Sequence, residues 1–178
     1  MVETDDHSII RKIRQGDVES FSVLVDRYQE AIYRLCYYMT GNKNDARDLT
    51  QEVFLKAYTN LDKVDFQYKF FSWLYRIAFN ESVTFARRKR YFSSVEELSV
   101  NDLESIDEET LQTAVRRNVR SAVLQLQPKH RILVVLKYYN ELSYQQMSII
   151  TGITEKKVKS RLFEARQVLR NILTEQIG

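Results

Sequence analysis

Apolar side chains recur at steps of three and four along positions 21–39, the spacing that places them on one face of an α-helix. They are Phe21, Leu24, Val25, Tyr28, Ile32, Leu35 and Met39. The remaining sequence predicts further helices near residues 8–14, 44–61, 70–90, 111–126, 128–139, 143–150 and 155–173. Because only four Gly and one Pro occur in 178 residues, tight turns are scarce, and we expect an all-α chain.

Charge divides the chain into three blocks. Residues 1–90 carry 15 Lys or Arg and 13 Asp or Glu, a net charge of +2. Residues 91–113 carry no Lys or Arg and seven Asp or Glu (−7), and residues 114–178 carry twelve Lys or Arg and four Asp or Glu (+8). We predict two small helical domains, an N-terminal bundle at 1–92 and a four-helix domain at 111–178, joined by an acidic flexible linker at 93–110. The basic block points to a polyanion such as nucleic acid, with a solvated helical surface as the alternative.

Little in the sequence suits catalysis or metal binding. Cys36 cannot form an internal disulfide, and two isolated histidines, His7 and His130, cannot build a zinc site. We therefore expect no enzymatic activity, no cofactor and no metal. We also expect a cytoplasmic protein, because no apolar stretch reaches the ~18 residues of a membrane span and the N-terminus is too acidic for a signal peptide. Three carboxylates share one helical face, namely those of Asp45, Asp48 and Glu52. This face could hold a metal, but a solvated or protein-binding face is the favoured interpretation.

The C-terminal block predicts a helix-turn-helix. Ser143 suits the start of a short helix, residues 151–154 form a Gly-containing turn, and Thr154 suits the start of a second helix. That second helix carries Lys156, Lys157, Lys159, Ser160, Arg161 and Arg166. Lys and Arg on its first turns could neutralise phosphates and pair with guanine edges in the major groove. The alternative is a basic solvated helix on an ordinary bundle.

Aromatic and cationic residues are interleaved along positions 66–92, which hold ten of the 21 aromatic residues. Exposed rings beside cations suit unstacked bases of single-stranded nucleic acid. Packing in the core is the alternative, and it is expected for about half of these rings.

Two separated motifs resemble a known family. Residues 45–58 (DARDLTQEVFLKAY) and 71–80 (FSWLYRIAFN), followed by Arg87 and Arg88, are similar to region two of the extracytoplasmic-function (ECF) sigma factors. Residues 158–166 (VKSRLFEAR), which follow 142–147 (LSYQQM), resemble their region four. The likeness covers nearly the whole chain in family order. It implies a transcription initiation factor that binds core RNA polymerase and directs it to specific promoters.

The resemblance implies a role for each surface. Docking on the β′ clamp helices of the polymerase would use Asp45, Asp48, Leu49, Gln51, Glu52 and Phe54. Melted promoter DNA at the minus-ten element would contact Asp65, Phe66, Lys69, Phe71, Trp73, Arg76, Asn80, Arg87 and Arg88. The helix-turn-helix would touch the polymerase β flap and read the duplex minus-thirty-five element through Lys156, Lys157, Lys159, Ser160, Arg161, Phe163 and Arg166. Family members are commonly held by an anti-sigma factor, often at the membrane, so that partner is expected too.

The chain departs from the family pattern at four positions, namely Arg47, Thr84, Lys156 and Lys157. The two lysines place cations at a helix N-terminus, which the helix dipole disfavours unless a phosphate or base contact offsets the cost. Two other classes of protein remain as alternatives. A helix-turn-helix repressor or activator would bind duplex DNA without polymerase, and a helical adaptor would use neither. Dependence on core polymerase distinguishes the three.

Overall fold

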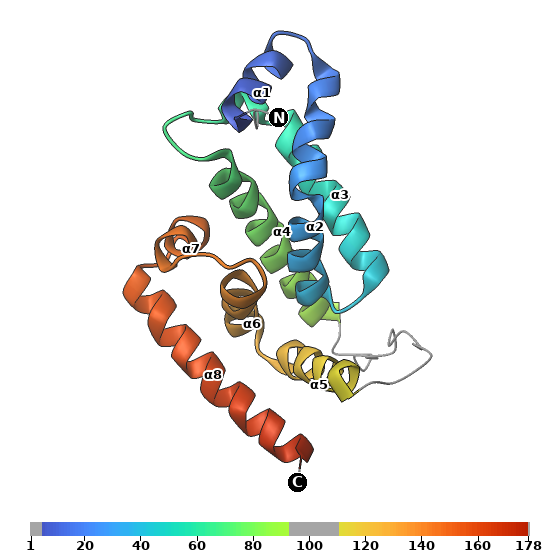
Figure 1. Ribbon diagram of the computed structural model, residues 1–178, viewed down its shortest axis with the longest axis vertical. Coiled ribbons are helices and arrows are strands. Elements are labelled where there is room, and N and C mark those ends of the chain that lie inside the picture. Colours follow the sequence, from blue (N-terminus) through green and yellow to red (C-terminus); the bar gives the residue numbers. More distant parts are fainter. Residues whose placement is uncertain (1–4, 93–110, 178) are drawn as a thin grey trace.

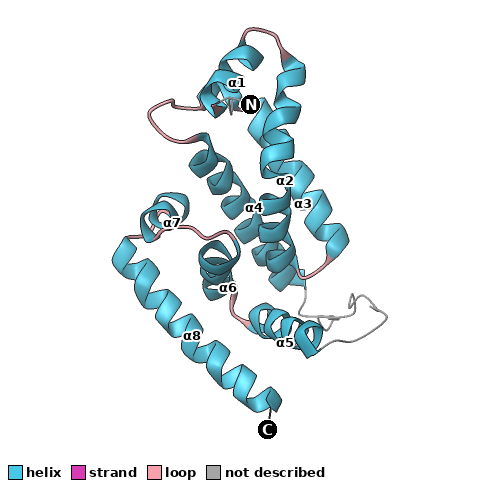
Figure 2. Cartoon of the chain, in the orientation of Figure 1, coloured by secondary structure: helices cyan, strands magenta, loops and turns pink. Residues whose placement is uncertain are grey.

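The computed structural model describes residues 5–92 and 111–177, so the predicted linker lies outside the described residues. The N-terminal half comprises α1 (Asp6–Arg14), the 3-10 turn η1 (Val18–Ser20), α2 (Phe21–Thr40), α3 (Lys43–Thr59), the 3-10 turn η2 (Leu61–Lys63) and α4 (Phe70–Phe92). The C-terminal half comprises α5 (Leu111–Gln125), α6 (Pro128–Val134), the π-helical turn η3 (Val135–Tyr139), α7 (Tyr144–Thr151) and α8 (Glu155–Ile177). The described part is helical where helices were predicted, which confirms the all-α expectation (Figure 2).

Local chemistry sets the helix boundaries. Gly41 ends α2 with a left-handed φ of 72°, as Gly152 ends α7 with φ 71°. The side chain of Asn42 caps the first turn of α3, so this helix begins slightly before the predicted 44–45. Ser143 and Gln146 form a reciprocal capping box at the start of α7, which satisfies two backbone donors there.

One hydrophobic core runs through both halves. In Figure 1, α2, α3 and α4 lie side by side with α1 at one end, and α6 lies beside α4 and α2. Helices α5, α6 and α7 all contact α8, which forms the outer edge of the C-terminal half. Fully buried side chains from both halves fill the core, including Leu24, Leu35, Val53, Leu74, Leu133, Leu136, Met147 and Ile150.

Polar contacts also fasten the halves together, and they end mainly on backbone carbonyls. The Arg131 guanidinium on α6 donates to the carbonyl oxygens of Tyr38 and Met39, at 3.2 and 3.4 Å. The Asn140 amide donates to the Ala31 carbonyl at 3.2 Å and to the Tyr75 hydroxyl at 2.8 Å. Burial lowers the pKa of the Arg131 guanidinium to about 10. Because the shared core and these hydrogen bonds hold the two halves against each other, we call this the closed arrangement.

Candidate polymerase and nucleic-acid interfaces

The acidic residues predicted on α3 form one side of that helix. Asp48, Gln51 and Glu52 are exposed, and Asp45 is half-buried. Glu52 Oε1 lies 2.9 Å from Lys56 Nζ, which also donates to Glu81 Oε2 on α4 at 2.6 Å. The bonds to Glu81 and then to Glu52 raise the pKa of Lys56. This network ties the outer face of α3 to α4.

Two of the residues predicted on this face lie beneath it. Leu49 and Phe54 are only 4% and 8% exposed, so they support the face from the core. Leu55 and Tyr58 instead project, at 62% and 37% exposure, and line an apolar hollow together with Phe21, Val25 and Phe54. Sequence reasoning missed Leu55 and Tyr58. Their signal was available, because Leu55 directly follows buried Phe54 and so must point elsewhere on a helix.

The residues predicted for minus-ten DNA fall mainly on one side of α4 and the preceding loop. Trp73, Arg76 and Asn80 are spaced three and four apart and share a face. Trp73 and Arg76 line a hollow of about 520 Å³ together with Asp65 and Tyr68, and Trp73 and Asn80 line a neighbouring one. Among the predicted residues, Asp65, Lys69, Arg76, Asn80, Arg87 and Arg88 are exposed, whereas Phe66, Phe71 and Trp73 are half-buried.

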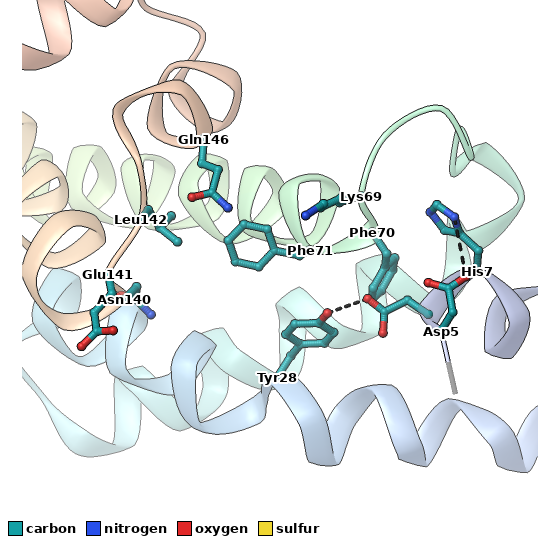
Figure 3. Close-up of a pocket in the computed structure, with 11 residues that line it drawn as sticks. Asp5, His7, Tyr28, Lys69, Phe70, Phe71, Asn140, Glu141, Leu142 and Gln146 are labelled. Carbon is teal, nitrogen blue, oxygen red and sulfur yellow. Dashed lines mark hydrogen bonds and ion pairs between the residues drawn. The ribbon is translucent and has the colours of Figure 1, made fainter. Parts of the chain in front are cut away.

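The structure does not bring Phe71 to that face. Its ring lies 4.5 Å from that of Tyr75 and 6.5 Å from that of Tyr28. It borders a different cavity, toward Gln146 of α7 (Figure 3). Tyr68 has the opposite placement: it is 58% exposed and lies in the hollow with Trp73, although sequence reasoning did not select it. No periodicity exists in a loop to reveal which way such a ring points.

The helix-turn-helix forms as predicted. Met147, Ile150, Val158 and Leu162 are buried between α7 and α8, and Ile153 is half-buried. The outer side of α8 presents Lys156, Lys157, Lys159, Ser160, Phe163 and Arg166, all exposed, and half-buried Arg161. Lys159 Nζ lies 5.3 Å from the centre of the Tyr144 ring, a cation–π distance that ties the basic face to α7.

The α4 face predicted to contact minus-ten DNA and the helix-turn-helix border the same hollow. Its opposite wall consists of Ser148, Ile149, Gly152, Ile153 and Thr154, from α7 and the turn. Within the described residues, no group of three or more His, Cys, Asp or Glu could hold a metal ion. In the same part of the chain, no helix is both long and apolar enough to span a membrane.

An aromatic and cationic face on α4 together with a helix-turn-helix fits a sigma factor, and the comparisons agree. Residues 24–91 match Sigma-70 region 2 and residues 116–169 match Sigma-70 region 4. The ECF RNA polymerase sigma factor SigW of Bacillus subtilis is 33% identical, over 93% of this chain and 95% of its own. The chain belongs to the ECF sigma factors, the promoter-directing subunits of bacterial RNA polymerase.

Other relatives have similar coverage. The ECF RNA polymerase sigma-E factor of Escherichia coli K12 is 29% identical over 93% of each chain. The fold is similar to that of CnrH, solved in complex with the cytosolic domain of CnrY, with a TM-score of 0.73 and 22% identity over 96% and 97% of the two chains. It is also similar to that of RpoE from Bartonella quintana, with a TM-score of 0.69 and 22% identity over 88% and 98%.

Proposed function

We propose that this sigma factor opens the minus-ten element with the loop and α4 face that carries Asp65, Tyr68, Trp73, Arg76 and Asn80. The observation that supports this role most directly is the pairing of an exposed and a half-exposed aromatic ring with an exposed guanidinium in one hollow. Stacking on such rings contributes ~1–3 kcal/mol per unpaired base, independently of base identity. The cation attracts the backbone of the same strand.

Helix α8 reads the duplex minus-thirty-five element. Its first turns present Lys156, Lys157 and Lys159, followed by Ser160 and Arg166, on one exposed side. An α-helix fits the major groove, where such cations bind phosphates and guanine edges. The buried contacts between α7 and α8 hold the helix rigidly enough for that reading.

The α3 face docks on the β′ clamp helices of core polymerase. Leu55 and Tyr58 provide exposed apolar anchors, and Asp48, Gln51 and Glu52 provide the polar rim beside them. Apolar anchors supply most of the affinity of such an interface, whereas charged rims set partner choice and the association rate.

Binding to a promoter requires the closed arrangement to open. The names of the minus-ten and minus-thirty-five elements place them about 25 base pairs apart, which is about 85 Å of B-DNA at ~3.4 Å per base pair. In the closed arrangement the two DNA-binding surfaces border one hollow of about 520 Å³. Core polymerase must therefore hold the two halves apart, with the linker between them.

An anti-sigma factor controls access to that open form. A solved structure of similar fold supports this partner, because RpoE of Bartonella quintana was solved with the anti-sigma factor NepR. We expect the anti-sigma factor of this protein to compete with core polymerase. A candidate that binds both the free protein and the assembled holoenzyme, without displacing the sigma factor from core polymerase, would contradict this role.

The first experiment is a pull-down of bacterial core polymerase with the full-length protein, followed by run-off transcription from genomic fragments. Leu55→Glu should abolish capture of the core enzyme, because it places a charge in the apolar hollow. Val115→Glu on α5 serves as the control, since Val115 is similarly exposed, at 54%, but lies outside this face. Promoter-selective transcripts would support the proposal. DNA binding without any polymerase binding would favour a repressor.

A further inference from the structure

The connection between α3 and α4 is fastened to α1 at its first end by one side chain. Arg14, on the last turn of α1, donates from its guanidinium to three carbonyl groups of the connection. The distances are 2.6 Å to Leu61, 2.9 Å to Asp62 and 3.0 Å to Val64. These bonds come from Nη2, and Nε also donates to the Leu61 carbonyl at 3.2 Å. Two neighbouring nitrogens of the planar guanidinium therefore share that carbonyl, an arrangement that an ammonium cannot form.

The same part of α1 also holds the ring of Phe66. The Arg14 guanidinium lies 4.7 Å from the ring centre and that of Arg11 lies 5.1 Å from it. The imidazole of His7 is 5.0 Å from the same ring. Phe66 is therefore turned toward α1, although it is one of the rings predicted to contact DNA.

The second end of the connection is held by His7. Its Nε2 lies 3.0 Å from the Tyr68 carbonyl oxygen, which can only accept, so Nε2 carries the donated proton. Between the two ends, the Tyr68 N–H donates to the Asp65 carbonyl at 3.1 Å and the Gln67 N–H donates to Asp65 Oδ1 at 2.9 Å. This turn leaves the Tyr68 ring exposed in the hollow beside Trp73.

We propose that α1 is a template for the loop that reads the minus-ten element, and that Arg14 is its positioning residue. This inference rests on the proposed minus-ten role of the loop. A loop without these bonds would exchange among several backbone conformations. The exposed polar side chains of the loop, Asp65 and Lys69, would then lose the fixed positions on which base discrimination depends, because reading groups must be held within about 0.5 Å. Arg14 acts without touching DNA itself.

The test uses full-length Arg14→Ala and Arg14→Lys, with Lys12→Ala as the matched control, since Lys12 is an exposed cation on the same helix. Hydrogen exchange of the free proteins reports the loop directly. Arg14→Ala should accelerate exchange of the amides in residues 61–69 about tenfold, and Lys12→Ala should not. Arg14→Lys should give an exchange rate between those of Arg14→Ala and the unmodified protein. It retains the positive charge but not the two neighbouring N–H donors of the guanidinium.

The second readout is promoter discrimination by the holoenzyme. Melting of a promoter identified by run-off transcription is followed by 2-aminopurine fluorescence, on the natural minus-ten element and on single-base variants of it. Arg14→Ala should reduce the preference for the natural element about tenfold, whereas Lys12→Ala should keep it. A ratio of rates on two promoters does not depend on the folded fraction, so a purely structural defect would leave it unchanged.

The outcomes separate cleanly. Faster loop exchange with lost discrimination supports the template. Unchanged loop exchange, or faster exchange with full discrimination, overturns it while the proposed function stands. Failure of the unmodified protein to direct core polymerase to any promoter overturns both, and it is seen before any variant is made.

Discussion

Cys36 lies at the centre of the N-terminal half, fully buried on α2. Burial raises the pKa of its thiol from 9.0 to about 11. The folded protein therefore keeps this proton to higher pH than the unfolded chain does, so the free energy of unfolding is unaffected below about pH 8 and falls above pH 9. At neutral pH the thiol is protonated and shielded, which makes it a packing group rather than a reactive one.

We expect the free energy of unfolding to fall by about 1 kcal/mol between pH 8 and pH 10 because of Cys36 alone. Urea unfolding at the two pH values measures it. Cys36→Ala should lower stability at both values yet show a flatter dependence across this interval. If the stability of Cys36→Ala fell with pH as steeply as that of the unmodified protein, the loss of stability at alkaline pH would come from other groups. Candidates are Tyr28, Tyr38 and Tyr75, whose pKa values are also raised.

Trp73 is half-buried: its ring centre lies 5.7 Å from that of Phe70, and its side chain lines the hollow together with Arg76. Trp73→Ala should cost about 2 kcal/mol of stability, less than the loss of a fully buried ring. It should also slow minus-ten melting by the holoenzyme at temperatures where the variant stays folded. Trp73→Phe should restore most of the stability. If melting then also returns fully, an indole is not required for opening.

At the scale of elements, α8 combines a buried stripe with an exposed cationic side. Lys156→Ala with Lys157→Ala should weaken holoenzyme binding to a duplex minus-thirty-five element. It should also lower the slope of log K against log salt by about 2, because each phosphate contact contributes about 0.9. Arg170→Ala, an exposed cation more than three turns further along α8, is the control. An unchanged salt slope would mean that the two lysines do not contact phosphates.

Sequence periodicity predicted the helices well because each carries its own apolar stripe and end signals. It predicted an ordinary helix through Tyr139, and here it was incomplete. The chain widens into a π-helical turn at η3, with the Asn140 N–H bonded to the Val135 carbonyl at 3.1 Å. This turn places the Asn140 amide against Ala31 and Tyr75. Contacts between distant segments favour that widening, and the local sequence contains no signal for them.

The same limit applies to the predicted site residues. Charge predicted the exposed cations of α8, and the family resemblance predicted Trp73, Arg76 and Asn80, which the structure places on one face. The resemblance also assigned Leu49 and Phe54 to the docking face, whereas their apolar side chains lie beneath it. No sequence signal turned Phe66 toward α1, since that position depends on a neighbouring element.

At the scale of the whole molecule, a few polar contacts hold the two halves closed. Removing four of them, with Arg131→Ala and Asn140→Ala together, should favour the open form about tenfold or more. Small-angle X-ray scattering should then give a radius of gyration above the ~16 Å of a compact chain of this length. Arg116→Ala, an exposed cation on α5, should leave the radius unchanged. Equal radii for all variants would mean that the apolar core alone keeps the halves together.

The hollow between α4 and α7 has a thermodynamic consequence for inhibition. Under the proposed opening, polymerase binds only the separated halves, so its apparent affinity equals its intrinsic affinity multiplied by the open fraction. A molecule that occupies the hollow, of about 520 Å³, would lower that fraction. Such a molecule would compete with polymerase without overlapping the α3 face. Each tenfold by which it favours the closed form would require up to a tenfold higher polymerase concentration for the same binding.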